Sequence, residues 1–237
     1  MKSDVDRIHV SIFPALDLYH DFTLRSAATN MAIDEALLEA VTIPSIRFYR
    51  WNSPALSFGY FGKFADVADY AIERDLVRRW TGGGIVFHGD DLTYSIVIPA
   101  SDPIFGESSR SIYEKIHRAL GDALIATGQR ALIAGVVDPS ATVTDASYNG
   151  QCFANPVRAD VMVNGRKVAG AAHRRTRAGL LHQGSIQRVD LGNDLAEQFA
   201  GELADVCDER SLTTQIVERA REIAQQKYDT QNWLQRR

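Results

Sequence analysis

The spacing of apolar and polar positions divides the chain into a few helices and many short strands. Between Ser26 and Val41 the apolar residues recur at steps of three and four, which predicts a helix. The same spacing over 109–127, where Ser109 can cap the first turn, predicts a second and clearer helix. A third helical pattern covers 64–76, and from Asp194 helical periodicity continues nearly to the end of the chain.

Shorter apolar runs bounded by turn residues predict strands in the middle of the chain. They cover 46–51, 55–60, 85–88, 93–98, 131–137, 160–163, 166–172 and 179–187. Between two of these runs, Asn164-Gly165 is the residue pair that a two-residue type I′ hairpin turn requires. Because helices gather toward the ends and strands in the middle, we predict an α+β fold with a mainly antiparallel sheet.

The pattern contains no repeat and no Pro/Gly/Ser-rich linker that would separate two domains. We therefore expect one domain over residues 1–237, with 191–237 forming two helices packed on it and no separate accessory domain. No run of 18 apolar residues is present, and the N-terminus lacks the features of a secretory signal, so we expect no membrane span. Two cysteines cannot build a disulfide framework, which favours a reducing, cytoplasmic location.

The net charge argues against nucleic acid as a partner. The chain carries 26 Lys and Arg against 30 Asp and Glu, a net charge of −4, which argues against binding nucleic acid by bulk charge. The basic cluster Arg174–Arg177 is then best interpreted as a solvated hairpin tip; a nucleic-acid patch or a docking point for an acidic protein are the alternatives. The spacing of the histidines matches no zinc motif, so we predict no metal site.

One group of candidate residues surrounds three successive glycines, Gly82, Gly83 and Gly84. They allow backbone N–H groups to approach a ligand closely, and Arg78 and Arg79 just before them can bind phosphate or carboxylate with paired hydrogen bonds. Alone, such a triplet is more often a flexible hairpin turn. It is neither a P-loop nor a G-x-G-x-x-G fingerprint.

A second group pairs Cys152 with Lys167, fifteen residues later. A thiolate is a competent acyl acceptor, and its pKa falls beside a positive charge, while an ammonium can stabilise the oxyanion that forms on an acyl carbonyl. A lone cysteine is more often a small core residue, but Cys152 ends a polar loop, which is a poor place to bury one. Cys207, in a charged helical segment, is interpreted as structural or incidental.

Four segments together resemble the lipoate–protein ligase and octanoyltransferase family, whose catalytic domain is related to that of biotin–protein ligase. They are residues 30–37, 51–59, 78–95 and 165–185. The order of an RR-x-x-GGG-x-V-x-H block and a later G-R-K-x-x-G carries the resemblance. It implies an α+β domain with a large mixed, mainly antiparallel sheet flanked by helices.

The resemblance also implies roles for individual residues. Lys167 is expected to hydrogen-bond the acyl carbonyl, and Gly170 and Ala172 to let the ligand lie close to the sheet. The residues expected to form the wall that holds the acyl chain are Arg79, Gly82, Gly83, Gly84, Ile85, Val86, Phe87 and His88, with Ile85 and Phe87 lining an acyl tunnel. His182 is expected to bind substrate, although His182-Gln183 reverses the family's usual Gln-His order and His173 stands where Gln is usual.

Cys152-Phe153 resembles one branch of octanoyltransferases. That branch takes octanoyl from an acyl carrier protein thioester onto the cysteine and delivers it to a lysine of a lipoyl domain, such as glycine-cleavage H protein or a dehydrogenase E2, without ATP or Mg²⁺. The alternative is an ATP- and Mg²⁺-dependent lipoate or octanoate ligase acting through an acyl-AMP, and a third is a non-catalytic protein that binds acyl chains or acyl carrier protein. Only about 47 residues follow position 190, which favours the transferase, because ligases often need an additional C-terminal domain. The sequence does not select between octanoyl and lipoyl, between acceptors, or between oligomeric states.

Overall fold

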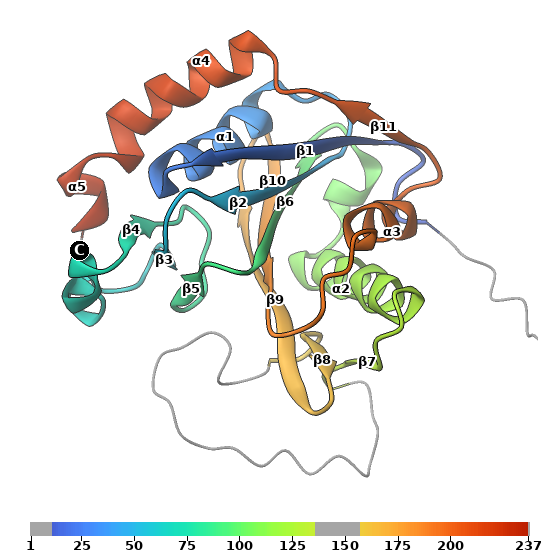
Figure 1. The fold of residues 1–237 in the computed structure, drawn as a ribbon. Helices are drawn as coiled ribbons and strands as arrows, with labels where there is room; N and C mark the ends of the chain where they lie inside the picture. Colours follow the sequence, from blue (N-terminus) through green and yellow to red (C-terminus); the bar gives the residue numbers. More distant parts are fainter. Residues whose placement is uncertain (1–10, 136–156, 237) are drawn as a thin grey trace, which may run out of the picture.

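A computed structural model describes residues 11–135 and 157–236, which form two sheets with helices around them (Figure 1). In the large sheet the strand order is β11-β1-β2-β6-β10-β9-β8-β7. Its strands are β1 Leu16–Arg25, β2 Ser45–Trp51, β6 Leu92–Pro99, β7 Ala131–Ile133, β8 Val161–Val163, β9 Arg166–Arg175, β10 Gly179–Ile186 and β11 Cys207–Arg210. Strand β1 pairs in parallel with β2 and with β11, and the other pairs are antiparallel, which confirms the predicted mixed, mainly antiparallel sheet.

A small sheet forms beside the large one from the segment that carries the glycines. Strand β3 Ala55–Phe58 lies at its centre, parallel to β4 Asp75–Arg78 and antiparallel to β5 Val86–His88. Glycines 82–84 therefore connect β4 to β5, its two edge strands.

Helices cover both faces of the large sheet. Helix α1 Ala27–Ala40 packs with α4 Thr214–Ile223 on one face, and α2 Ser109–Ala126 packs with α3 Leu195–Leu203 on the other (Figure 1). The core is divided in the same way, because alternate residues of a strand point to opposite faces. The short helix α5 Gln231–Leu234 lies against β4. No helix in the described residues is long and apolar enough to cross a membrane.

The two predicted long helices are confirmed, with one change at a cap. The Ser26 hydroxyl accepts the Thr29 N–H at the start of α1. At the start of α2 the capping side chain is Ser108 rather than Ser109: Ser108 has extended backbone angles, and its hydroxyl accepts the Ser111 N–H.

Other segments differ from the prediction. Residues 64–76, predicted to be helical, form two 3₁₀ turns and the start of β4, because Asp75–Arg78 pairs with β3. The predicted strand 131–137 ends at Ile133 within the described part. The C-terminal part, predicted as two helices, contains α3, β11, α4, a π-helical turn Ala224–Tyr228 and α5. Strand β1 was not predicted at all.

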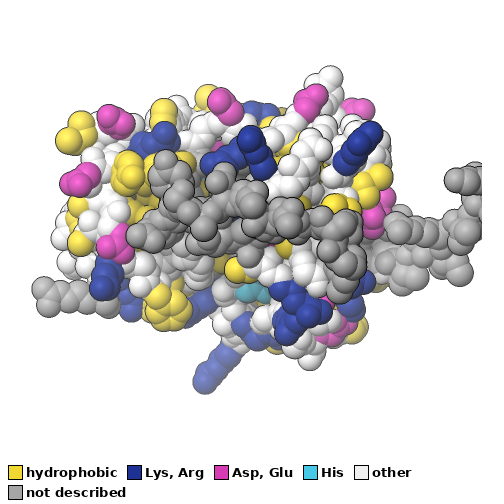
Figure 2. Space-filling model, turned by 90° about the horizontal axis from the view of Figure 1, so that it is seen from below, with side chains coloured by type: hydrophobic (Ala, Val, Ile, Leu, Met, Phe, Trp, Pro, Cys, Tyr) yellow, Lys and Arg dark blue, Asp and Glu magenta, His cyan; other side chains and the backbone are white. Residues whose placement is uncertain are grey.

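The predicted hairpin turn is confirmed and orients the site. Asn164 and Gly165 have φ of 50° and 75°, the left-handed values that a type I′ turn needs at both positions. The turn folds β9 back on β8 and pairs Lys167 with Met162. This hairpin lies at the lower end of the molecule in Figure 1, and the view from below shows Lys and Arg side chains in both its upper and its lower half (Figure 2).

Candidate active site

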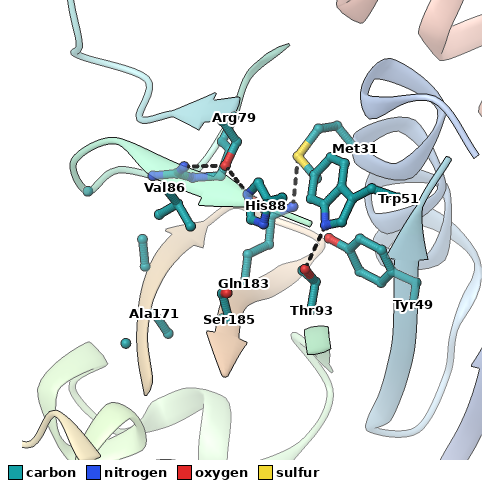
Figure 3. A pocket seen from close by; sticks show the side chains of 15 residues that line it. Met31, Tyr49, Trp51, Arg79, Val86, His88, Thr93, Ala171, Gln183 and Ser185 are labelled. Carbon is teal, nitrogen blue, oxygen red and sulfur yellow. Dashed lines mark hydrogen bonds between the residues drawn. The ribbon is translucent and has the colours of Figure 1, made fainter. Parts of the chain in front are cut away.

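A cavity opens between the large sheet, the small sheet and α1 (Figure 3). The residues that line it come from α1, from six strands of the two sheets and from the segment between β4 and β5. They are Met31, Tyr49, Trp51, Ser57, Arg79, Gly83, Val86, His88, Thr93, Gly170, Ala171, Ala172, Gln183, Gly184 and Ser185.

One set of polar side chains in the wall is held by a buried carboxylate of α1. Asp34 accepts hydrogen bonds from Tyr49 Oη (3.1 Å), Ser95 Oγ (2.7 Å) and Gln183 Nε2 (2.7 Å), and it pairs with Arg47 Nη1 (2.8 Å). Burial, together with the Asp34 carboxylate, raises the pKa of Tyr49 well above its usual range, so the phenol stays protonated and donates. The polar groups on this side of the cavity therefore bond to the protein.

A second buried carboxylate organises the opposite wall. Asp91 Oδ2 accepts hydrogen bonds from His88 Nδ1, Thr93 Oγ1 and Ser185 Oγ, each at 2.7 Å. Trp51 Nε1 donates in turn to Thr93 Oγ1 (2.8 Å). Burial acts to raise the pKa of Asp91, but the attraction of His88 and the hydrogen bonds outweigh it and lower the pKa to about 2. Asp91 is therefore ionised at neutral pH.

Arg79 ties the glycine segment to the small sheet. Its guanidinium donates to Ser57 Oγ (2.7 Å) and to the carbonyls of Gly82 (3.1 Å) and Gly84 (2.8 Å). Gly83 has a φ of 87°, which favours glycine, and a Cβ there would lie 3.2 Å from Arg79 Nη2. The segment also crosses Gly59 so closely that a Cβ on Gly59 would lie 2.1 Å from the Gly83 carbonyl oxygen. Sequence reasoning missed this requirement at Gly59.

Lys167 lies beside the cavity in a buried ion pair. Its Nζ is 2.8 Å from Asp160 Oδ2, and the two side chains are 2% and 0% exposed. Asp160 also accepts the Tyr113 hydroxyl (2.7 Å) and the Val157 N–H (2.7 Å). The Lys167 side chain lies across Gly170, where a Cβ would come within 2.5 Å of Cε and 2.7 Å of Nζ. Asp160 and Tyr113 thus hold a predicted site residue, and both were missed; the acidic start of the apolar strand 160–163 was the available signal.

His182 lies on the other face of the sheet. It is completely buried and bonds to His173 Nε2 (2.6 Å) and Tyr94 Oη (3.2 Å), while its neighbour Gln183 lines the cavity. Burial lowers the pKa of His182 well below its usual range, and neighbouring histidines lower it further. A contact between His182 and substrate stays a prediction that the cavity lining does not support.

The other predicted site residues are divided between the cavity and its surroundings. Arg79, Gly83, Val86, His88, Gly170 and Ala172 line the cavity, while Gly82 and Gly84 bind Arg79 through their carbonyls. Ile85 and Phe87, predicted to line an acyl tunnel, instead pack against Leu56, Phe58 and Val67. For Phe87 the reason is strand alternation, which sends Val86 and His88 to the cavity side of β5. Cys152 lies outside the described residues.

Two further expectations concern cysteine and metal. Cys207, interpreted as structural, lies half-buried on β11 with its thiol 3.3 Å from the Ala200 carbonyl, and burial raises its pKa. In residues 11–135 and 157–236 no three His, Cys, Asp or Glu side chains are placed to hold a metal ion.

The sequence profile of the family described as "Lipoyl protein ligase A/B catalytic domain" matches residues 26–224. The chain belongs to this family. It is 38% identical over 172 residues to octanoyltransferase LipM of Oceanobacillus iheyensis, which covers 69% of this chain and 61% of that protein. It is 36% identical over 177 residues to octanoyltransferase LipM of Moorella thermoacetica, with 70% and 63% covered. The matched region therefore spans less than two thirds of these curated relatives.

A solved structure shows the same fold. Protein Ta0514 of T. acidophilum with bound lipoic acid superposes with a TM-score of 0.72 at 23% identity, covering 94% of this chain and 99% of that one. This similarity confirms the lipoate-ligase catalytic-domain fold that the four sequence segments implied.

Proposed function

We propose that the protein is an acyltransferase of lipoate metabolism. It moves an octanoyl group from an acyl carrier protein thioester, through a thioester on Cys152, to a lysine of a lipoyl domain. The observation that supports this most strongly is the cavity wall. Tyr49, Trp51 and Gln183 direct their hydrogen bonds to other protein groups, so the cavity suits an apolar chain. The similarity to octanoyltransferases LipM supports the same choice.

The energetics of chain binding fit an octanoyl group. Each buried methylene contributes about 0.8 kcal/mol, so a medium-length chain gains several kcal/mol without any polar contact. Small residues let it approach the sheet: Gly170, Ala171 and Ala172 of β9 line the cavity beside β10, where Ala171 pairs with Gly184.

In the first half-reaction the Cys152 thiolate attacks the carbonyl carbon of the octanoyl thioester. Negative charge develops on the carbonyl oxygen, and the Lys167 ammonium stabilises it. The bond to the pantetheine sulfur then breaks, and that thiolate takes the proton that Cys152 gave up. In the second half-reaction the neutral amine of the acceptor lysine attacks the Cys152 thioester, which forms an amide and releases the thiol.

Asp160 has a positioning role in this scheme. Its carboxylate pairs with Lys167 Nζ and holds that side chain along Gly170, next to the cavity. A thioester donor is already activated, so the proposed reaction uses neither ATP nor Mg²⁺. Thiol chemistry of this kind belongs in a reducing compartment, and we place the reaction in the cytoplasm. The proposed partners are octanoyl–acyl carrier protein as donor and a lipoyl-domain protein, such as glycine-cleavage H protein or a dehydrogenase E2, as acceptor.

The test is a transfer assay with a purified lipoyl domain as acceptor. One arm contains octanoyl–acyl carrier protein and EDTA without ATP; the other contains octanoate, ATP and Mg²⁺, and pyrophosphate release is measured. We expect octanoylated acceptor in the first arm only, and its loss in the Cys152→Ser variant. Acceptor modification confined to the second arm, with pyrophosphate release that survives Cys152→Ser, would replace the proposal with the ligase alternative. No modification in either arm would favour the non-catalytic alternative.

A further inference from the structure

Three residues in and beside the cavity wall form a hydrogen-bonded series that the transfer reaction does not use. Ser57 Oγ of β3 lies 2.6 Å from His88 Nε2 of β5, and His88 Nδ1 lies 2.7 Å from Asp91 Oδ2. All three side chains are buried, and Ser57 and His88 line the cavity. A hydroxyl, an imidazole and a carboxylate in this order are the arrangement that activates a serine nucleophile.

The surroundings of Asp91 determine which group donates and which accepts in each hydrogen bond of this series. Asp91 is ionised and accepts hydrogen bonds from the Gly89 N–H (3.0 Å) and the Ser185 hydroxyl (2.7 Å), so it also accepts a hydrogen bond from His88 Nδ1–H. In the neutral imidazole, Nε2 then accepts from Ser57. The indole of Trp51 stacks on the His88 ring at 4.1 Å and fixes its plane. His88 is therefore oriented as a base toward the serine hydroxyl.

Arg79 adds a positive charge at the nucleophile. Its Nη1 donates to Ser57 Oγ at 2.7 Å, and a cation at this distance favours the alkoxide over the hydroxyl. Figure 3 shows Arg79 and His88 next to each other on the cavity wall. An acyl group that enters the cavity meets the serine, its base and a cation together.

We propose that Ser57, His88 and Asp91 form a hydrolytic site for medium-chain acyl thioesters and esters held in the cavity. The choice of an acyl chain as the bound substrate rests on the proposed function. The assignment of Ser57 as a nucleophile does not. Ser57 Oγ attacks the carbonyl carbon while His88 Nε2 takes its proton, and the Arg79 guanidinium faces the developing oxyanion. The C–S bond breaks, and His88 protonates the leaving thiolate. Water, deprotonated by His88, then cleaves the Ser57 ester and releases the carboxylic acid.

The test measures octanoate released from octanoyl–acyl carrier protein without any acceptor, using the full chain. In the Cys152→Ser background, which removes the competing thiol, adding Ser57→Ala is expected to lower the release by at least about 100-fold. Ser45→Ala is the matched control, because Ser45 is equally buried but does not line the cavity. An alkyl fluorophosphonate should add one adduct to the peptide that contains Ser57. If Ser57→Ala fails to fold, Ser57→Cys in the Cys152→Ser background should accumulate an octanoyl thioester that hydroxylamine removes.

The outcomes separate this inference from the proposed function. Release that is lost in Cys152→Ser but kept in Ser57→Ala would overturn the inference and support the Cys152 route. Release that depends on Ser57 in a chain that forms no Cys152 thioester would support the inference and overturn that route. No release above buffer in any variant, with no fluorophosphonate adduct on Ser57, would overturn the inference.

Discussion

Lys167 and Asp160 are charged side chains that lie almost wholly inside the protein. Taking two such charges out of water is costly, and their attraction offsets that cost only while both are present and correctly placed. The position of the pair therefore matters for stability and, in our proposal, for stabilising the oxyanion.

The contact between Lys167 and Gly170 gives one prediction. Gly170→Ala places a methyl group 2.5–2.7 Å from the end of the Lys167 side chain, which must then move. We expect octanoyl transfer to fall at least about tenfold, because a misplaced ammonium no longer faces the oxyanion. Gly201→Ala is the control: it lies on α3 with nothing within 4 Å of an added methyl, and helix propensity favours alanine there. Equal transfer rates in the two variants would contradict the role of Gly170.

Removing the carboxylate of the pair gives a second prediction. Asp160→Asn leaves a buried ammonium without its counter-charge, which is expected to lower the free energy of unfolding by about 3–5 kcal/mol. Denaturant titration measures it. Adding Lys167→Met removes the second charge and should recover much of the loss. A double variant that is less stable than Asp160→Asn would show that the pair is not the source of the effect.

At the scale of elements, a series of hydrogen bonds links helix α2 to strands β6, β10 and β9. It runs through three neutral imidazoles and one tyrosine. His117 Nδ1 lies 2.7 Å from the Ala159 carbonyl, which can only accept, so His117 carries its proton on Nδ1. Its Nε2 then accepts from Tyr94 Oη, and Tyr94 accepts from His182, which accepts from His173. Burial lowers the pKa of His117 to about 4 and that of His173 to about 3.

This series predicts sensitivity to acid. In the unfolded chain these imidazoles take up protons near pH 6.5, but in the folded chain only at much lower pH. The stability they contribute is present above about pH 6.5 and is lost as the pH falls toward the folded values, about 4 for His117. Three such groups give a slope of up to about 4 kcal/mol per pH unit. Urea unfolding between pH 7 and 4.5 measures it.

The control for the acid prediction keeps the hydrogen bond and removes the titration. In His117→Asn the amide N–H replaces Nδ1 as donor to the Ala159 carbonyl. One proton fewer is then taken up on unfolding. We therefore expect the dependence of the unfolding free energy on pH to become shallower by roughly 1.4 kcal/mol per pH unit. An unchanged slope would mean that His117 does not contribute to the acid sensitivity.

Some helices and strands could be predicted from the sequence pattern alone, and others could not. Helices α1 and α2 and the strands of the central hairpins follow apolar periodicity, because one side of each faces the core. Strand β1 was missed because its apolar pattern is interrupted by buried Asp21, which pairs with Arg47. Strand β11, with the sequence Cys-Asp-Glu-Arg, has no pattern of its own and forms because β1 offers it a parallel edge.

The same limit applies to the site. The glycine segment, Arg79, His88 and Lys167 were found because glycines and charged residues in a fixed order are visible in sequence. Ser57, Asp91 and Asp160 were not, because their roles come from strand pairings that bring distant positions together. Strand alternation also explains His182: reversing the usual Gln-His order turns a glutamine toward the cavity and an imidazole toward α2.

At the scale of the whole molecule, the C-terminus is fastened to the start of the glycine segment. Arg78 is almost fully buried and donates to the carbonyls of Trp233, Leu234 and Arg236, each at 2.9 Å at closest. Trp233 Nε1 donates back to the Arg78 carbonyl at 2.9 Å. The C-terminal partners in these contacts follow residue 224, where the family match ends.

Deleting residues 231–237 should therefore weaken the whole fold. Arg78 loses three carbonyl acceptors, and hydrogen bonds to charged groups each contribute about 1.5–3 kcal/mol. We expect the free energy of unfolding to fall by at least about 3 kcal/mol, measured by denaturant titration. Gln235→Ala is the control, because this exposed side chain bonds only to Gln231. A deletion that behaves like the control would show that the C-terminus does not support Arg78.

In the proposed reaction an octanoyl group passes through a thioester on Cys152. The most direct measurement is the intact mass of the protein after incubation with octanoyl–acyl carrier protein, without ATP, for the wild type and Cys152→Ser. We expect one octanoyl group on the wild type, removed by neutral hydroxylamine, and no such thioester on the variant. An unmodified wild-type protein, or the same hydroxylamine-labile adduct on Cys152→Ser, would contradict it.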